Sequence, residues 1–338
     1  MKNEDISELK ELLGTPRKIV IVPHKGPDGD AMGATLALKL FLEAQEHHVQ
    51  LISPNQYPDF LKWMPYQEEV LIYENNKERA DDYIEEADAI FTLDFNHLSR
   101  AGEMQESLEA ADSFFVMIDH HQQPGDYANI TYSDTTMCST CQMVYHFIEH
   151  LGYAEKITPQ IATCLYTGIM TDTGSFRFRS TTSLTHKVVA DLIEKGADNT
   201  TIHENIYDTN TYSKLQLLGV ALNNLKIVEG LRTAYITLSQ EELDRHNFKK
   251  GDTEGFVNYG LSLEGIVFAA IFIENQAENM VKISLRSKGT FSVNEFSRMH
   301  FSGGGHTNAA GGKSDLSLQE TVEKFISILP EYKTSLSK

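Results

Sequence analysis

The chain has few cysteines and few basic residues, and it has no long apolar run. Its three cysteines are too few for a disulfide framework, which is typical of a reducing compartment. No apolar stretch approaches the length of a membrane span. Acidic residues crowd the first twelve positions and argue against a signal peptide. We therefore expect a cytoplasmic protein without a membrane anchor.

The shortage of basic residues makes the chain strongly acidic. Lys and Arg total 29 against 48 Asp and Glu, which gives a net charge of −19. Proteins that hold long nucleic acid use basic surfaces that displace counterions from many phosphates. The composition therefore argues against long nucleic acid as a partner. Small anions remain compatible with it if metal ions and a few arginines neutralise them locally.

The length and the apolar runs predict two α/β domains. A chain of 338 residues exceeds what one hydrophobic core usually supports. In the first part, buried strands alternate with helices, which is typical of a parallel sheet; the strands are expected at 18–22, 49–52, 70–73, 89–93 and 114–118. Further strands are expected at 231–238, 265–274 and 280–286. We predict a parallel-sheet domain over 1–211, a linker helix within 212–228, and a smaller mixed-sheet α/β domain over 229–338.

Carboxylate and imidazole side chains follow three of the predicted strands. Ligands gather beyond the carboxyl ends of parallel strands, so we expect these side chains to meet at one edge of the sheet. One aspartate after the first strand would serve as a helix cap, but two aspartates with a histidine favour a cation such as Mn²⁺, Mg²⁺ or Zn²⁺. The residues are His24, Asp28 and Asp30, then Asp94, then Asp119, His120 and His121.

Two later segments have both a structural and a functional interpretation. Asp172 follows a predicted helix and either starts a turn or adds a metal ligand. The glycines at 303–305 before His306 form either a passive turn or a phosphate site built from successive backbone N–H groups. We favour phosphate binding, because apolar elements flank this glycine cluster more closely than they flank a flexible linker.

Other patterns are interpreted as structural. Cys138 and Cys141 form a C-x-x-C without a second pair, so we interpret them as buried thiols rather than as a redox or zinc site. His146 and His150 lie one helical turn apart, and we expect them on a solvated face. The alternation of Phe and Arg at 176–179 predicts a strand. A stripe of leucines can pack on either domain or on a second subunit, at positions 215, 218, 222 and 225.

The motifs taken together resemble the DHH phosphoesterase superfamily. The resemblance rests on HKGPDGDA at 24–31, Asp94, the DHH triplet at 119–121, TDTGSFRF at 171–178 and GGGH at 303–306. The part after the linker resembles the DHH-associated domain, and the two-domain organisation is similar to the nanoRNase and pAp phosphatase group. The resemblance implies an active site in the cleft between the two domains.

The resemblance also implies roles for single residues. One Mn²⁺, or Mg²⁺ in its place, would have the ligands His24, Asp28 and Asp94. A second ion would share Asp94 and add the ligands Asp30, His120 and Asp172. Asp119 would orient the histidines, and His121 would contact the substrate phosphate or assist the leaving oxygen. The nucleotide would be held from the second domain by Arg286, Gly303, Gly304, Gly305 and His306.

The implied activity is hydrolysis of RNA of two to five nucleotides, or of pAp to AMP and phosphate. A hydrolase of linear pApA would use the same ligands and is the nearest alternative. The GGGH motif argues against a family II pyrophosphatase, and the net charge of −19 argues against an exonuclease that acts on long strands. The full set of metal ligands argues against a nucleotide sensor without catalytic activity. The resemblance further implies a homodimer, which the leucine stripe does not establish.

Overall fold

The computed structural model describes residues 1–337, which form two compact units. The first unit is Met1–Thr209, and the second begins at Asn210. Helix α9 (Tyr212–Asn223), which the sequence predicted as a linker, is part of the second unit. Among residues 1–337, none of the helices combines the length and the apolar character that crossing a membrane requires.

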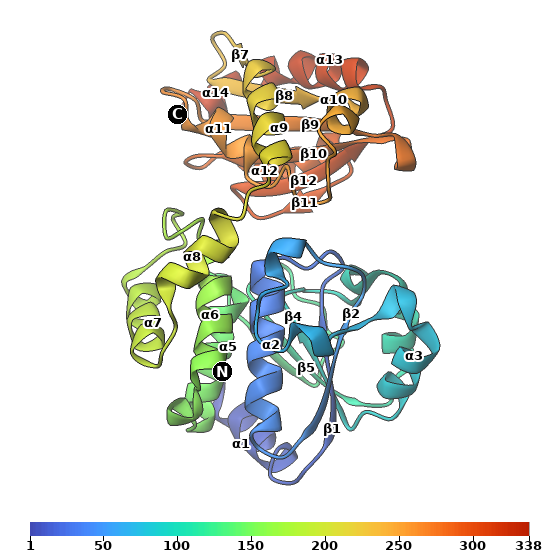
Figure 1. Cartoon of the computed structure of the whole chain (residues 1–338), viewed down its shortest axis with the longest axis vertical. Helices are drawn as coiled ribbons and strands as arrows, with labels where there is room; N and C mark the ends of the chain where they lie inside the picture. The colour runs from blue at the N-terminus through green and yellow to red at the C-terminus, as the bar shows by residue number, and fades with distance from the viewer. Residues whose placement is uncertain (338) are drawn as a thin grey trace. The chain divides into compact units, whose positions relative to one another are not determined.

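The first unit contains a six-stranded parallel sheet with helices on both faces (Figure 1). The strand order is β3-β2-β1-β4-β5-β6. The strands are β1 (Lys18–Pro23), β2 (His48–Ser53), β3 (Leu71–Ile72), β4 (Ala89–Leu93), β5 (Phe114–Asp119) and β6 (Ile130–Ser133). The helices are α1 (Asn3–Leu12), α2 (Gly29–Glu43), α3 (Lys77–Glu85), α4 (Gln105–Ala110), α5 (Thr140–Leu151), α6 (Pro159–Asp172), α7 (Ser183–Glu194) and α8 (Asn199–Tyr207).

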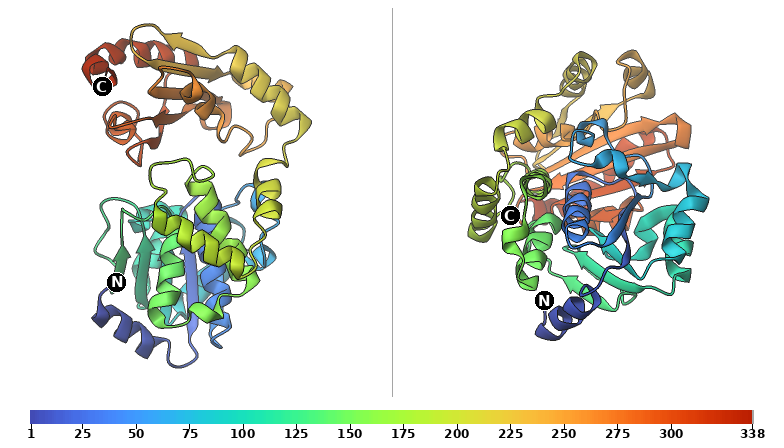
Figure 2. Two further views of the ribbon diagram at one scale, coloured as in Figure 1. Left: turned by 90° about the vertical axis from the view of Figure 1, so that its left-hand side faces the viewer. Right: turned by 60° about the horizontal axis from the view of Figure 1, so that its bottom comes forward.

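The central strands β1, β4 and β5 are mostly apolar and buried because both faces of the sheet are covered. Ile19 and Ile21 of β1 belong to a core with α2, α5 and α6. Val20 and Val22 point to the opposite face and belong to a second core with α3 and α4. Figures 1 and 2 show these helices on the two sides of the sheet. The predicted α/β parallel-sheet fold is therefore confirmed.

The strand order places a topological switch point between β1 and β4. The chain proceeds from β1 to β2 and β3 on one side, and then returns to add β4, β5 and β6 on the other. Pro23 and Leu93, the last residues of β1 and β4, are register partners. The loops that follow these strands therefore start side by side, where ligands bind in open α/β sheets.

The second unit contains a mixed six-stranded sheet in the order β11-β12-β10-β9-β8-β7. Strands β8 and β9 are parallel, and the other neighbours are antiparallel. The strands are β7 (Lys226–Val228), β8 (Thr233–Leu238), β9 (Phe268–Asn275), β10 (Met280–Ser287), β11 (Gly304–Gly305) and β12 (Ala309–Ser314). The helices after α9 are α10 (Gln240–Arg245), α11 (Phe256–Ser262), α12 (Val293–His300), α13 (Leu318–Ile328) and α14 (Lys333–Leu336).

The two faces of the second sheet have different cores. Aromatic rings fill the face under α12 and α13, where Phe268, Phe272 and Phe325 are in edge or tilted contact. The other face packs against α9, α10 and α11 through smaller apolar residues of β8 and β9. Strand β10 is buried only through alternate residues, so its remaining side chains lie on the face opposite the aromatic core.

Three structural expectations from the sequence need correction. Residues 176–179 form turns and not a strand, because Gly174, Ser175 and Phe176 all have a left-handed backbone conformation. His146 is buried, and its Nδ1 lies 3.0 Å from Glu149 Oε2, whereas His150 is exposed as expected. Burial of this position follows from α5 being covered on most sides within the first core.

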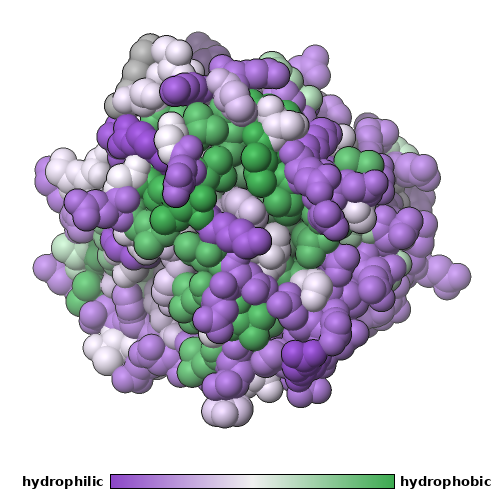
Figure 3. All heavy atoms as spheres, turned by 90° about the horizontal axis from the view of Figure 1, so that it is seen from above, coloured by the Kyte–Doolittle hydropathy of each residue, from purple (hydrophilic) through white to green (hydrophobic). Residues whose placement is uncertain are grey.

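The leucine stripe of α9 is the third correction. Leu218 and Leu225 of the stripe pack, partly buried, against the core that contains Leu217 and Ala221, while Leu215 and Leu222 remain 50% and 44% exposed. Figure 3, which views the molecule from above, shows apolar residues exposed among hydrophilic ones. The three cysteines are buried free thiols, as predicted.

Candidate metal centre

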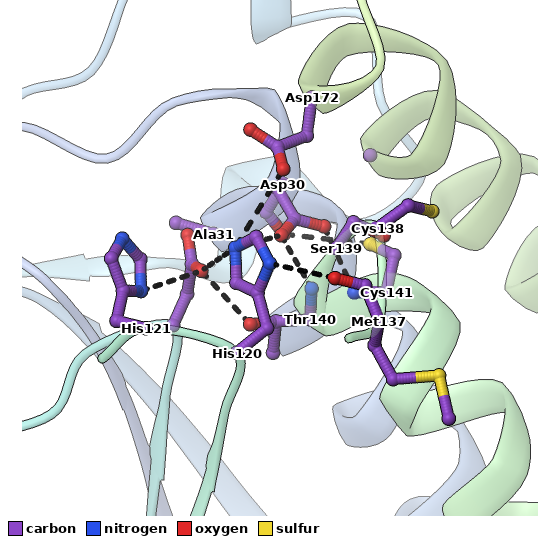
Figure 4. Close-up of polar contacts among 12 residues, drawn as sticks. Asp30, Ala31, His120, His121, Met137, Cys138, Ser139, Thr140, Cys141 and Asp172 are labelled. Carbon is purple, nitrogen blue, oxygen red and sulfur yellow. Dashed lines mark hydrogen bonds and ion pairs between the residues drawn. The ribbon is translucent and has the colours of Figure 1, made fainter. Parts of the chain in front are cut away.

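Eight of the residues singled out in the sequence meet at the carboxyl edge of the first sheet. They come from the loop after β1, the start of α2, the ends of β4 and β5, and the end of α6, and Figure 4 labels Asp30, His120, His121 and Asp172 among them. In two groups of three residues, the potential ligand atoms lie within 4.8 Å of one another; the groups are His24, Asp28 and Asp94, and Asp30, His120 and Asp172. Asp119 and His121 lie equally close to Asp94.

Asp94 faces both groups. Its Oδ2 lies 3.5 Å from His24 Nε2, and its Oδ1 lies 3.5 Å from His120 Nε2. The two oxygens of one carboxylate are thus directed at imidazoles that belong to different groups, which is the geometry that a bridging ligand requires. Asp94 has a left-handed backbone conformation, which is uncommon for a residue with a side chain and points to a functional constraint.

Both histidines direct Nε2 at this carboxylate. His24 Nδ1 lies 3.0 Å from the carbonyl oxygen of Lys25, and His120 Nδ1 lies 3.3 Å from that of Met137. A carbonyl oxygen only accepts hydrogen bonds, so each Nδ1 carries a proton and Nε2 is the nitrogen left to bind a cation beside the carboxylate oxygens. The arrangement therefore fits a metal ion.

The electrostatics of the site lead to the same conclusion. Burial, followed by the charges of Asp30 and Asp28, raises the pKa of Asp94 well above its usual value. Burial also raises the pKa of Asp30 and lowers that of His24. A divalent cation would reverse the effect of burial on the two carboxylates, which bind metal when ionised, and would reinforce the effect on His24, which binds metal as the neutral imidazole.

The N-terminus of α5 holds two of the carboxylates. The backbone N–H groups of Thr140 and Cys141 donate to Asp30 Oδ2 and Oδ1 at 2.6 and 2.9 Å. The Thr140 hydroxyl donates to Asp94 Oδ1 at 2.8 Å. Ser139 caps the helix by accepting from the N–H of Gln142. The positive end of the helix dipole is therefore directed at Asp30, and one residue positions both carboxylates (Figure 4).

Close packing of α2 against α6 brings Asp30 and Asp172 together. A Cβ at Gly33 would lie 2.5 Å from the carbonyl oxygen of Cys164. A Cβ at Gly168 would overlap Cys141 Sγ and lie 2.8 Å from Asp30 Oδ1. Both positions therefore require glycine, since only its hydrogen leaves room for this approach.

Asp119 contacts His121, one of the two histidines that it is expected to orient. His121 Nδ1 lies 2.7 Å from Asp119 Oδ1, and Asp119 is fully buried, while the His121 side chain is 20% exposed. The Nδ1 atom of His120 lies 3.3 Å from the carbonyl oxygen of Met137. A carboxylate on Nδ1 fixes the tautomer and the ring orientation of His121.

The residues predicted to bind substrate lie in the second unit. Arg286 is half-buried on β10, and its Nη1 donates to the carbonyl oxygen of Leu285 at 3.0 Å. The glycine cluster forms the edge strand β11 instead of an open loop. The N–H groups of Gly303 and His306 donate to Ser297 O and Ala309 O at 3.4 and 2.7 Å. Two of the backbone N–H groups in this segment are therefore engaged within the second unit, one by α12 and one by Ala309 of β12.

Comparison with known proteins connects this geometry to a family. A model of the N-terminal domain of the DHH family matches residues 18–169, and a model of the DHHA1 domain matches residues 232–333. A bifunctional oligoribonuclease and PAP phosphatase from Thermus thermophilus, NrnA, is 30% identical over 93% of this chain and 89% of its own. The chain belongs to the DHH family.

Two further proteins are similar to this chain over most or all of its length. A probable bifunctional oligoribonuclease and PAP phosphatase NrnA from Streptococcus mutans is 29% identical over 88% of this chain and 89% of its own. The crystal structure of an exopolyphosphatase-related protein from Bacteroides fragilis is 40% identical, covers 100% of this chain and 98% of its own, and superposes with a TM-score of 0.96.

Sequence reasoning missed two residues of this DHH domain. Thr140 carried no signal beyond its place at a helix start, where hydroxyl residues are common. Arg100 is exposed, its carbonyl oxygen accepts from the N–H of Lys25 at 2.7 Å, and its charge contributes to the lowered pKa of His24. An arginine six residues after Asp94, in an acidic chain, was the available signal.

Proposed function

We propose that this chain is a dinuclear metal phosphoesterase that hydrolyses RNA of two to five nucleotides to mononucleotides, pAp to AMP and phosphate, or both. The observation that carries the proposal is the position of two imidazole nitrogens, Nε2 of His24 and Nε2 of His120, each 3.5 Å from a different oxygen of Asp94. The oligoribonuclease and PAP phosphatase activities for which the Thermus and Streptococcus relatives are named support the choice of substrate.

The proposed metal ligands fall into two sets that share Asp94. We assign His24 and Asp28 to one ion, and Asp30, His120 and Asp172 to the other. Imidazole nitrogen with carboxylate oxygen suits Mn²⁺, which we propose as the metal, with Mg²⁺ as the alternative. Two such ions supply Lewis-acid polarisation of the phosphoryl group and an acidified water as nucleophile.

Residues of the chain supply the other steps of the reaction. Asp94, which accepts a hydrogen bond from the Thr140 hydroxyl, would fix the position of one ligand set relative to the other. Water attacks phosphorus in line as the bond to the leaving oxygen breaks, and that oxygen takes up a proton. His121 is placed to give this proton from Nε2, because its Nδ1 is engaged by Asp119 at 2.7 Å.

We propose that the second unit binds the nucleotide. Arg286 offers a planar fork that matches a phosphate, and Gly303, Gly304, Gly305 and His306 would complete the nucleotide-binding part of the second unit. The net charge of −19 disfavours long nucleic acid as a partner. We also propose a cytoplasmic location, in line with the free thiols, and a homodimer, which sedimentation equilibrium would test.

The test is product analysis with a substrate panel. The protein is stripped of metal and incubated with pAp, pApA and 5′-phosphorylated RNA dimers, with Mn²⁺ or with chelator, and the products are separated by chromatography. We expect release of AMP or other mononucleotides with Mn²⁺ only. Preference for pApA over pAp and mixed-sequence dimers would move the assignment to a linear dinucleotide hydrolase.

Asp94→Asn is the matched variant for this assay. Asparagine has the same shape and tolerates the left-handed backbone, so the fold should persist while activity is lost. Asp82→Asn on the exposed side of α3 is the control and should retain activity. Wild-type turnover by Asp94→Asn, or no turnover of any substrate by the unmodified chain with Mn²⁺, would contradict the proposed function.

A further inference from the structure

Two lysines oppose each other on the second sheet. Lys282 of β10 and Lys313 of β12 are register partners in an antiparallel pair, and both are exposed. Directly opposed residues of such a pair have their Cβ atoms roughly 5 Å apart and on the same face. Among residues 1–337, neither ammonium group has an acidic side chain within 4.0 Å.

This placement is costly for the protein alone. Like charges directly opposite in a sheet repel and reduce stability. The chain has 48 acidic residues with which to neutralise 29 basic ones, yet it leaves this pair unneutralised. An uncompensated pair of cations on adjacent strands is suited to an anion that lies between or across them.

The lysine pair lies on the same face as Arg286. Side chains alternate along β10, so Lys282, Ser284 and Arg286 share the face opposite the aromatic core. Four residues of a strand span ~13 Å, which separates the lysine pair from the arginine. The sheet surface between the lysine pair and Arg286, which we call the floor, carries small side chains because Ser284 lies opposite Gly311 of β12.

Gly311 is a glycine that the fold does not explain. A Cβ there would have Ile283 O as its nearest neighbour, at 3.8 Å, and the backbone is not left-handed. By contrast, a Cβ at Gly312 would lie 2.8 Å from Ser297 Oγ and 2.9 Å from Phe301 O. Glycine inside a strand often marks a close approach of a ligand or another backbone, and within residues 1–337 nothing comes closer than 3.8 Å to the Cβ position of Gly311.

We propose that Lys282, Lys313 and the floor at Gly311 form a second phosphate-binding subsite for the backbone of an oligonucleotide. The inference rests on the proposed function, in which Arg286 binds the phosphate of the first nucleotide. The subsite lies beyond the reach of a single nucleotide held at Arg286. It therefore favours RNA of several nucleotides and contributes nothing to pAp.

The experiment compares long and short substrates. Binding of a labelled 5′-phosphorylated RNA pentanucleotide is measured by fluorescence anisotropy in chelator, and hydrolysis of the pentanucleotide and of pAp is measured with Mn²⁺. In K282A/K313A, the slope of log affinity against log salt should fall in magnitude by about 0.7, since the one phosphate neutralised at this subsite on a single strand contributes about 0.7. The kcat and KM for pAp should stay unchanged.

Three variants control this result. K282R/K313R keeps both charges and should bind the pentanucleotide like the unmodified chain. K249A/K250A removes two exposed lysines elsewhere in the same unit and should have no effect. The fold leaves room for a side chain at position 311, so Gly311→Val should fold normally. The valine side chain should weaken pentanucleotide binding without altering pAp turnover. Thermal unfolding of K282A/K313A should occur at or above the wild-type temperature, because a repulsion is removed.

Failure of the subsite is distinguishable from failure of the proposed function. If K282A/K313A has the wild-type salt slope and pentanucleotide affinity while pAp is hydrolysed, the subsite is wrong and the phosphoesterase assignment stands. An equal loss for pAp and for the pentanucleotide also contradicts the subsite, because the lysines would then act on the first nucleotide. If no substrate is hydrolysed by the unmodified chain with Mn²⁺, the proposed function is wrong, and the inference that rests on it is withdrawn.

Discussion

The Thr140 hydroxyl donates a hydrogen bond to Asp94 Oδ1 at 2.8 Å, across 46 residues of sequence. Asp94 is the one carboxylate whose two oxygens face imidazoles of both ligand groups. Thr140 therefore positions the residue on which the whole arrangement depends. Such outer partners of metal ligands typically contribute roughly 10- to 100-fold to metal affinity or activity.

Replacing Thr140 by valine should weaken Mn²⁺ binding. The substitution keeps the shape of the side chain and removes the hydroxyl, so we expect a loss of roughly 10- to 100-fold in affinity by calorimetric titration. Thr140→Ser keeps the hydroxyl and should restore most of it. If valine and threonine bind Mn²⁺ equally well, the hydrogen bond has no positioning role.

Replacing Asp119 by asparagine should lower kcat. The carboxylate that holds His121 Nδ1 at 2.7 Å becomes a neutral amide, and loss of a general acid typically costs roughly 10²- to 10⁴-fold. Mn²⁺ stoichiometry should not change, because the proposed ligands are intact. Asp126→Asn in the exposed loop that follows is the control. A kcat within twofold of wild type would remove the Asp119 and His121 pair from the mechanism.

Metal-free protein should lose stability as the pH rises. Burial and neighbouring carboxylates raise the pKa of Asp94 in the folded state, so the folded chain keeps a proton that the unfolded chain has lost. The stability from that proton is present below the unfolded pKa, about 3.9, and is lost as pH rises through the folded pKa. His24 acts oppositely at low pH, because its folded pKa is lowered by burial.

Asp94→Asn isolates this effect. Scanning calorimetry of metal-free protein from about pH 5 to pH 8 should show the variant gaining stability relative to the wild type as pH rises. Added Mn²⁺ should reverse the order, because the wild type then has a cation to neutralise the carboxylates. A difference in melting temperature that does not depend on pH would contradict the assignment of the raised pKa.

Replacing Gly168 by alanine should disturb both the fold and the metal site. The added methyl would overlap Cys141 Sγ and crowd Asp30, so we expect a loss of roughly 1–3 kcal/mol in unfolding free energy and weaker Mn²⁺ binding. Gly219→Ala in α9 is the matched control, since no atom lies within 4 Å of its Cβ position. It should be neutral or stabilising by up to about 1 kcal/mol.

Much of the first unit was predictable because its strands are buried on both faces. The run Ala89–Leu93 is apolar except for Thr92 and leads directly into Asp94, so both the strand and the position of the carboxylate follow from local pattern. The edge of the sheet where these residues meet follows from parallel topology. The grouping of His24, Asp28 and Asp94 needed only that rule and the chemistry of the donors.

The remaining features depend on contacts that local pattern does not contain. Thr140 contacts Asp30 and Asp94 from distant segments, and a hydroxyl at a helix start has an ordinary explanation as a cap. The alternation at 176–179 resembles a strand, but the left-handed residues before it turn the chain into a loop. Cross-strand partners such as Lys282 and Lys313 become visible only when the register is known.

The most direct test of a shared carboxylate is calorimetric titration of Mn²⁺ into metal-free protein, compared with the same titration into Asp94→Asn. The account predicts two Mn²⁺ per chain for the wild type and a loss of affinity for both in the variant, because Asp94 belongs to both ligand sets. Two ions bound with unchanged affinity by Asp94→Asn, or no Mn²⁺ bound by the wild type, would contradict it.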